Sequence, residues 1–377
     1  MLVIAASGRI LAQAAHRAGK PVRVMDRYGD LDTRAAAGEV KVEPLVGDRT
    51  AGPALMEAID RFSPISRGES VVWGGGLEGQ AELLEQLAER REVLGNSGEQ
   101  VRLVKDPGSW TALLSRLDLP YPETRREPPA DGAGWLSKMR GASGGWHIRP
   151  ADAEDAGANR YFQRQAAGAP HSVLFVADGE RARILGITEQ WTGREQSGSA
   201  GDFRYGGALS HAPLAADVAR GLTEAVSAIT AAVGLRGLNG LDFVTDGREL
   251  QLLEVNPRPV ATLDLYREGL NPSPFLLHLS GSRGSLPHFQ AQPPGVYRGH
   301  AVVYAEESVR IPQGLLEHPW CGDRAPGGTF FPEGAPVCTV HARHADREQT
   351  RRQLWRRHRW IREQLRQAPV SEPAFSA

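Results

Sequence analysis

Two carboxylates and an amide lie in two strand-like segments that a short turn connects. Segment 237–244 reads Gly-Leu-Asn-Gly-Leu-Asp-Phe-Val and contains Asp242, and segment 252–259 reads Leu-Leu-Glu-Val-Asn-Pro-Arg-Pro and contains Glu254 and Asn256. The Thr-Asp-Gly-Arg stretch between them predicts an antiparallel hairpin, in which Asp242 and Glu254 can lie side by side. Asn256 is two residues after Glu254 and therefore faces the same side of its strand.

These three side chains suit a divalent cation that carries the phosphates of a nucleotide. Carboxylate and amide oxygens are ligands that Mg²⁺ prefers, with Mn²⁺ as the alternative ion. The other interpretation is a hairpin with ordinary charged residues, but unpaired carboxylates beside apolar strand residues are unfavourable. We therefore predict a metal site at Asp242, Glu254 and Asn256. Arg258 lies two residues after Asn256, on the same side of the chain, and can bind a phosphoryl or carboxylate group with its planar guanidinium.

A lysine followed by a glycine-rich loop is the second candidate. Residues 138–148 read Lys-Met-Arg-Gly-Ala-Ser-Gly-Gly-Trp-His-Ile. A strand would deliver Lys138, and the glycines that follow can adopt positive φ and bring backbone N–H groups close to phosphate oxygens. The loop contains neither the Gly-Lys-Ser/Thr of a Walker loop nor a Rossmann fingerprint. An ordinary turn is the alternative interpretation.

The composition excludes several other classes of function. Among 377 residues there are 44 basic and 45 acidic ones, so the net charge of −1 gives no reason to expect nucleic acid or an anionic membrane as partner. The Arg-rich segment 346–367 could suggest RNA, but we expect a solvated helix with Leu354, Trp355 and Ile361 packed inward. No apolar run approaches the ~20 residues that cross a bilayer. We expect a cytoplasmic protein with free cysteines.

Strand–helix–strand patterns begin the chain. The apolar run at 2–6, the helical spacing from Ile10 to Ala18 and the run at 22–25 predict a parallel sheet in the first hundred residues. Another strand is expected at 71–73, followed by a helix at 78–90 and a last strand at 93–94.

Short strands and two helices are expected in the rest of the chain. We predict a helix over 107–122 and another over 214–233, with a linker at 281–294. The predicted strands lie at 135–139, 161–165, 172–176, 184–188, 241–244, 250–255, 297–304 and 337–342. The polar stretch 192–207 between two of these elements is either a lid or substrate rim, or a disordered insertion. His147, His171 and His211 are scattered, and we expect them in the core or on the surface.

The order of these motifs resembles the ATP-grasp superfamily. Lys138 and its glycine loop come first, then Gln163-Arg164-Gln165, then Asp242, Glu254 and Asn256. Further segments are similar to the predicted ATP-dependent carboligases of that superfamily. This subgroup is similar to the tyramine–glutamate ligase of methanofuran synthesis. The segments are Ser7-Gly-Arg-Ile-Leu-Ala, Arg17-Ala-Gly-Lys, Asp26-Arg-Tyr-Gly-Asp30-Leu-Asp-Thr33, Gly76-Leu-Glu78, Leu94-Gly-Asn96, Val104-Lys-Asp-Pro107 and Gly334-Ala-Pro-Val-Cys-Thr-Val.

The resemblance implies an α/β architecture with three parts. We expect an N-terminal parallel-sheet domain at 1–100 and a two-lobed ATP-grasp domain at 101–285 with a lid lobe at about 125–170. A small β-rich module with a closing helix is expected at 286–377.

The resemblance also implies roles for individual residues. Lys138 would contact the α- and β-phosphates of ATP, and the loop containing Gly141, Ser143, Gly144 and Gly145 would cover the β- and γ-phosphates. Asp242, Glu254 and Asn256 would bind Mg²⁺, and Arg258 would hold the transferring phosphoryl group or the acyl phosphate.

The nucleotide base is less well defined by the resemblance. Gln163, Arg164 and Gln165 would lie at the hinge beside the adenine. Many members carry an acidic residue where this chain has Arg164, so the nucleoside contacts stay open. Many also have Asp-Lys where this chain has Asp106-Pro107. Either Lys105 takes over this contact with the nucleotide or the contact is absent.

The expected activity is that of an ATP- and Mg²⁺-dependent ligase. It would activate a carboxylate as an acyl phosphate and couple it to an amine, with glutamate and a tyramine- or tyrosine-like amine as the first candidates. Small-molecule substrates are the expected partners, and a homodimer is left open. The alternatives are a carboxylase-like enzyme that uses bicarbonate and a non-catalytic nucleotide-binding regulatory protein.

Overall fold

A parallel five-stranded sheet forms the N-terminal part of the computed structural model, which describes residues 1–152, 159–194, 202–268, 270–289 and 295–368. Its strand order is β3-β2-β1-β4-β5, and every pair is parallel. The strands are β1 (Leu2–Ile4), β2 (Arg23–Asp26), β3 (Glu39–Val42), β4 (Val71–Trp73) and β5 (Val93–Leu94). The helices that connect them are α1 (Arg9–Arg17), α2 (Leu31–Ala36), α3 (Gly52–Phe62) and α4 (Ala81–Arg90). The predicted parallel sheet is confirmed.

A small four-stranded sheet follows two short helices. The helices are α5 (Gly98–Lys105) and α6 (Pro107–Arg116), and the strands are β6 (Thr124–Arg125), β7 (Trp135–Met139), β8 (Arg149–Pro150) and β9 (Arg160–Arg164). The strand order is β6-β9-β7-β8. The helix predicted over 107–122 ends early, at Arg116, because Asp118 takes a positive φ of 53° before the prolines.

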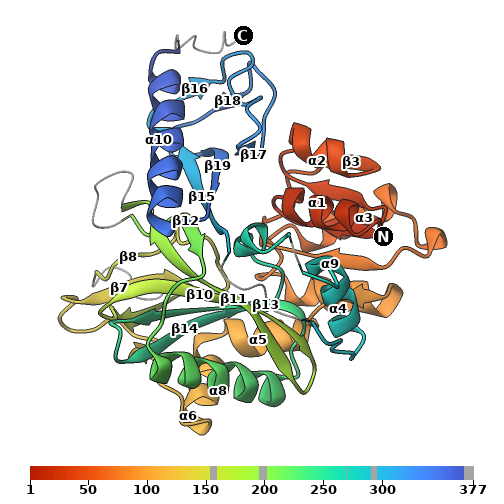
Figure 1. Cartoon of the computed structure of the whole chain (residues 1–377). Helices are drawn as coiled ribbons and strands as arrows, with labels where there is room; N and C mark the ends of the chain where they lie inside the picture. The colour runs from red at the N-terminus through yellow and green to blue at the C-terminus, as the bar shows by residue number, and fades with distance from the viewer. Residues whose placement is uncertain (153–158, 195–201, 269, 290–294, 369–377) are drawn as a thin grey trace.

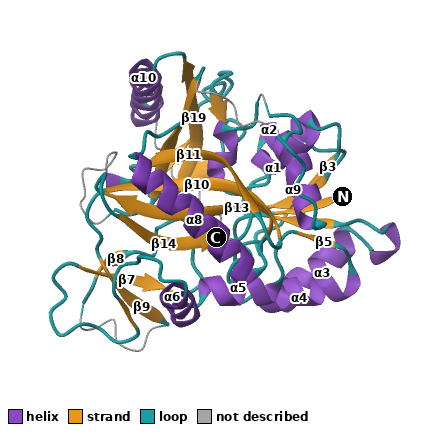
Figure 2. Ribbon diagram, turned by 60° about the horizontal axis from the view of Figure 1, so that its bottom comes forward, coloured by secondary structure: helices purple, strands orange, loops and turns teal. Residues whose placement is uncertain are grey.

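An eight-stranded sheet forms the centre of the molecule (Figure 1). Its strands, in spatial order, are β14 (Leu250–Asn256), β13 (Arg236–Thr245), β10 (Ala169–Asp178), β11 (Ala182–Thr192), β12 (Tyr205–Ser210), β15 (Tyr297–Tyr304), β19 (Pro336–His344) and β17 (Cys321–Gly322). Helix α8 (Ala216–Val233) lies across one face of this sheet, and α10 (Arg347–Arg366) stands beside β15 and β19 (Figures 1 and 2). The remaining elements of the described residues are α9 (Pro274–Ser282), the two-stranded ribbon of β16 (Val309–Arg310) and β18 (Phe330–Phe331), and two short 3-10 helices, η1 (Ile65–Arg67) and η3 (Ala261–Leu265).

Three C-terminal strands, β15, β17 and β19, belong to the central sheet. Strand β12 pairs with β15 through Gly207 opposite Ala301 and Leu209 opposite Gly299, so β15 and β19 continue the central sheet. The expected β-rich part with a closing helix is therefore built largely as a continuation of the central sheet. The physical reason is that β12 would otherwise be an exposed edge with unpaired backbone groups. The domain boundaries themselves stay a prediction.

The apolar cores connect the N-terminal part with the central sheet. One cluster of buried residues includes Val3 and Val24 of the parallel sheet together with Leu174 and Leu238 of the central sheet. Helix α10 packs inward through Leu354 and Ile361, as predicted. Within the described residues, no helix combines the length and the hydrophobicity needed to cross a bilayer.

Asn96 joins the parallel sheet to the hairpin that carries the predicted metal ligands. Its amide nitrogen donates to Asn239 Oδ1 (2.7 Å) and to the carbonyl of Pro257 (2.8 Å), and its Oδ1 accepts the backbone N–H of Arg236 (2.8 Å). Asn96 is fully buried, so no water can replace these bonds if the side chain is removed.

We predict that Asn96→Ala lowers the free energy of unfolding by about 2–4 kcal/mol, because several buried polar groups lose their partners. Urea unfolding followed by circular dichroism measures this change. Ser97→Ala is the neighbouring control, since it removes only the helix cap of α5 and should cost about 1 kcal/mol. An Asn96→Ala variant as stable as Ser97→Ala would contradict this role.

Candidate active site

The β13–β14 hairpin brings the three predicted metal ligands together. Asp242 lies directly opposite Glu254, and Asn256 lies opposite Gly240. The amide nitrogen of Asn256 donates to Asp242 Oδ2 at 2.9 Å. The register shifts immediately after Asp242, where two residues of β14 oppose one of β13. Such a bulge re-aims side chains locally.

Two lysines from other elements approach these carboxylates. Lys105, at the end of α5, donates to Glu254 Oε2 and to Asn256 Oδ1, both at 2.9 Å. Lys138, on β7, is buried and donates to Gln163 Oε1 at 2.7 Å. Lys105 therefore contacts two of the predicted metal ligands in this structure, and its contact with the nucleotide stays a prediction.

Burial and charge act differently on the two carboxyls. Burial, together with the negative charge of Glu254, raises the pKa of Asp242 to about 6. Burial also tends to raise the pKa of Glu254, but Lys105 and Lys138 hold it below its usual value. Burial lowers the pKa of Lys138, and the two carboxylates oppose that change. Such perturbed groups are common where a protein binds charged ligands.

The glycine loop has the backbone that its sequence predicts. The φ angles of Gly141, Gly144 and Gly145 are +63°, +79° and +76°, a region that side chains rarely tolerate. A Cβ on Gly145 would also lie 1.9 Å from the carbonyl oxygen of Phe203. The carbonyl of Gly144 accepts the backbone N–H of Tyr205 at 3.0 Å, so the loop rests on the start of β12.

Most of the predicted site residues line one cavity of 520 Å³. Its size is in the range of small-molecule sites. The lining includes all the predicted nucleotide and metal residues except Lys105 and Gly141: Lys138, Ser143, Gly144, Gly145, Gln163, Arg164, Gln165, Asp242, Glu254, Asn256 and Arg258. Lys105 and Gly141 line a narrow pocket that also touches Glu254.

Two of the predicted hinge residues, Gln163 and Arg164, make contacts within the protein. The side chain of Gln163 is buried between Lys138 and the hydroxyl of Thr124, so it orients the lysine. Arg164 is exposed, and its guanidinium lies over the ring of Trp135 at 5.4 Å. Neither contact depends on a nucleotide, and no local sequence pattern predicts either of them.

Arg258 is paired with a glutamate that sequence reasoning did not select as a site residue. Its Nε donates to Glu78 Oε1 at 2.6 Å, and Glu78 Oε2 accepts the backbone N–H of Gly76 at 2.6 Å. Although burial tends to raise the pKa of Glu78, Arg258 and Lys105 hold it below its usual value. The Gly-Leu-Glu segment after β4 is the sequence feature that could have identified Glu78 as a site residue.

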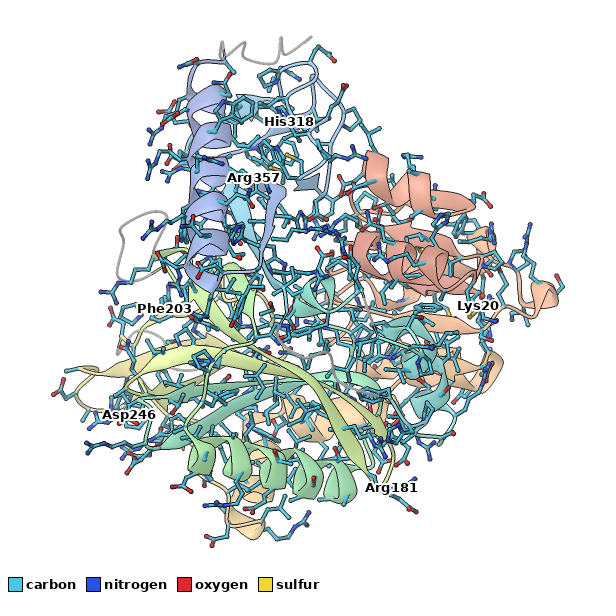
Figure 3. The ribbon with its side chains drawn as sticks, in the orientation of Figure 1. Lys20, Arg181, Phe203, Asp246, His318 and Arg357 are labelled. Atoms are coloured by element: carbon cyan, nitrogen blue, oxygen red, sulfur yellow. The ribbon has the colours of Figure 1, made fainter. Side chains whose placement is uncertain are left out.

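The expected rim at 192–207 is only partly described, since residues 195–201 lie outside the described part. Arg194 lines the cavity, whereas Arg204 forms an ion pair with Asp202 at 2.6 Å. Trp191 is buried, with its ring 5.4 Å from that of Trp355. Phe203 and the hairpin-turn residue Asp246 lie on the side of β7 and β8 (Figure 3).

Of the three scattered histidines, His147 lines the larger cavity, whereas His171 and His211 pack against aromatic rings. The Nδ1 of His147 accepts the backbone N–H of Met139 at 3.1 Å, and burial lowers the pKa of this ring to about 4. His171 stacks on Phe243, and His211 contacts the ring of Tyr266 edge-on.

A second cavity of 330 Å³ lies between the parallel sheet and the C-terminal strands. Sequence reasoning did not predict it, because its walls come from segments far apart in the chain. Ser7, Tyr28 and Gly75 line one side, and Val302 and Thr339 line the other. The two cavities share Tyr205, Arg258, Val260 and Ala261.

The comparisons with known proteins agree with this geometry. Residues 109–262 match the family model of the ATP-grasp domain. No curated protein matches the chain in sequence. Among solved structures, a biotin carboxylase from Campylobacter jejuni has a TM-score of 0.71 at 14% identity, covering 97% of this chain and 95% of the other.

Two further structures cover the chain nearly as well. An L-amino acid ligase from Bacillus licheniformis has a TM-score of 0.69 at 13% identity and covers 96% of each chain. The biotin carboxylase domain dimer of a Hydrogenobacter thermophilus 2-oxoglutarate carboxylase, in complex with MgADP, ADP and bicarbonate, has a TM-score of 0.66 at 13% identity, with 91% and 86% coverage. This chain therefore contains an ATP-grasp domain at residues 109–262 and has the ATP-grasp fold over nearly its whole length.

Proposed function

We propose that this chain is an ATP- and Mg²⁺-dependent ligase that activates a carboxylate as an acyl phosphate and couples it to an amine. The observation that carries the proposal is the meeting of Asp242, Glu254 and Asn256 with Lys138 around one cavity beside a glycine loop. Two carboxylates, an amide and a buried cation suit a nucleotide with its metal ion.

The residues present fit a magnesium ion. Asp242, Glu254 and Asn256 offer hard oxygen ligands on one face of the hairpin, and the raised pKa of Asp242 shows that a further positive charge would be favourable there. Bound Mg²⁺ would neutralise charge on the phosphates during transfer. Lys105 already occupies oxygens of Glu254 and Asn256, so its ammonium would turn toward the phosphates when the ion binds.

The chain's own groups would position the transferring phosphoryl group. Lys138, oriented by Gln163, would bind phosphate oxygens as a point charge. The loop from Gly141 to Gly145 would bring its N–H groups over the phosphates and exclude water from the acyl phosphate. Arg258, held by Glu78 where the two cavities meet, would bind the carboxylate that receives the phosphoryl group.

The identities of the two substrates are predictions from the sequence. Glutamate and a tyramine- or tyrosine-like amine are the first candidates, as in methanofuran-type coenzyme synthesis. The proposed ligase has the same fold as the L-amino acid ligase, but two of the three structures are biotin carboxylases, and one of these holds bicarbonate. A bicarbonate-using carboxylase is therefore the second candidate function.

The test of the proposal is ADP release by the purified chain with Mg²⁺ and ATP. We expect stimulation by glutamate together with tyramine or tyrosine, above the rate with either compound alone. Stimulation by bicarbonate without any amine would instead favour the carboxylase. Another acid that stimulates only with an amine would retain the ligase chemistry and exclude glutamate. ATP binding without ADP formation under all conditions would favour a regulatory protein.

We predict that Glu254→Gln abolishes ADP formation with little loss of stability, because a neutral amide is a much poorer ligand for Mg²⁺. Coupled-enzyme detection of ADP measures the activity, and a thermal melt checks the fold. Glu249→Gln is the matched control, since Glu249 is exposed in the turn of the same hairpin. Near-normal turnover by Glu254→Gln would refute the metal assignment.

We predict that Lys138→Ala weakens ATP binding roughly tenfold, because a charge-assisted hydrogen bond to phosphate is lost. Isothermal titration calorimetry measures the affinity. Lys20→Ala is the control, since Lys20 is exposed on the far side of the N-terminal part (Figure 3). Unchanged affinity in Lys138→Ala would show that the phosphates bind elsewhere.

A further inference from the structure

The second cavity has an apolar wall with a few charged groups in it. Ala5, Ile10, Val337 and Phe331 provide apolar surface, and Tyr28 and Tyr304 add aromatic rings. Its volume of 330 Å³ admits a small molecule. Because this cavity meets the nucleotide cavity at Arg258 and Tyr205, a ligand held here would lie next to the proposed acyl phosphate.

Besides Arg258, three charged side chains line this cavity, and two of them neutralise each other. Arg9 donates to Asp323 through Nε at 2.8 Å and through a terminal nitrogen at 3.1 Å. The other terminal nitrogen of Arg9 lies 3.0 Å from Asp264. Asp323 also accepts from the hydroxyls of Thr339 (2.6 Å) and Ser7 (3.1 Å). The charges of Arg9 and Asp323 are therefore already used within the protein.

Asp30 is the third charged group, and its carboxylate has no such partner. Asp30 is 5% exposed and lines the cavity, and its carboxylate oxygens make no hydrogen bond or ion pair with any residue in the described part of the chain, although its backbone carbonyl accepts the N–H of Arg34. It precedes α2 in the capping position but does not cap the helix. Its neighbour Asp32 differs, because it accepts the backbone N–H groups of Asp323 (3.1 Å) and Arg324 (3.0 Å).

The surroundings of Asp30 favour a positive charge. Burial raises its pKa to about 8, and the negative charges of Asp323, Asp32 and Asp26 add to that rise, while Arg9 opposes it. A buried carboxylate without a partner is unfavourable for folding, so it is expected where a ligand supplies the missing charge.

We propose that Asp30 binds the ammonium group of the amine substrate, with the apolar or aromatic body of that substrate packed along Ile10, Tyr28 and Phe331. This inference rests on the proposed function, because it places the amine beside the carboxylate that Arg258 would hold. Asp30 is a binding residue in this proposal, and its charge selects a primary amine over a neutral compound of the same shape.

Direct binding to the full chain tests the proposal without any turnover. In calorimetry, phenethylamine, tyramine and hexylamine are the amine probes, and phenethyl alcohol is the neutral analogue. We expect at least one amine to bind to the wild type, and we expect phenethylamine to bind at least about tenfold more tightly than the alcohol. Asp30→Asn should weaken amine binding about tenfold and leave the alcohol and ADP affinities unchanged.

Two variants serve as controls for the charge and the fold. Asp217→Asn removes an exposed acid of α8 and should leave amine affinity unchanged. Asp30→Asn should unfold at the same temperature as the wild type or higher, because a neutral amide of the same shape replaces a buried carboxyl whose ionisation is unfavourable. Asp30→Glu should retain more of the amine affinity than Asp30→Asn does.

Three results would overturn the role of Asp30. They are equal binding of phenethylamine and its alcohol, wild-type amine affinity in Asp30→Asn, or no binding of any of the three amines to the wild type. A failure of the ligase proposal is seen separately, in the ADP assay and in Glu254→Gln, because amine binding is measured without ATP.

Discussion

The pairing of Asp242 with Glu254 across one hairpin is the constraint on which the rest of the site depends. Two carboxylates in register repel each other, and burial strengthens that repulsion. Cations from two separate elements offset this repulsion: Lys105 from α5 and Lys138 from β7. The arrangement concentrates buried charge with perturbed pKa values at one end of the hairpin, a pattern common where proteins bind charged ligands.

The N-terminal sheet is part of the same arrangement. Asn96, just after the last strand of this sheet, donates to the carbonyl of Pro257, which directly follows the proposed metal ligand Asn256. Glu78 binds Arg258, the residue after Pro257. The Asn96 contact is buried and the Glu78 contact is partly buried, so they hold the end of the hairpin in a defined position relative to the parallel sheet. A substrate bound between the two parts would therefore meet preorganised groups.

The two cavities divide the proposed chemistry between them. The larger one is lined by the phosphate-binding and metal-binding groups, and the smaller one has an apolar wall with one buried carboxylate that the protein leaves without a partner. Arg258 and Tyr205 border both. The backbone N–H of Tyr205 also donates to the carbonyl of Gly144 in the glycine loop, so the position of the loop and the shape of the second cavity depend on the same strand.

The sequence by itself determined the local features: the parallel strands, the hairpin, the positive φ angles of the glycine loop and the alignment of Asp242 with Glu254, because each follows from side-chain periodicity or glycine geometry over short distances. Only the tertiary structure decided that β15 and β19 extend the central sheet, that Gln163 binds Lys138, and that Glu78 holds Arg258. It alone also placed Asp30 in a cavity. These features join residues far apart in the chain, and no local pattern specifies which distant groups meet when strand edges and charges find their partners.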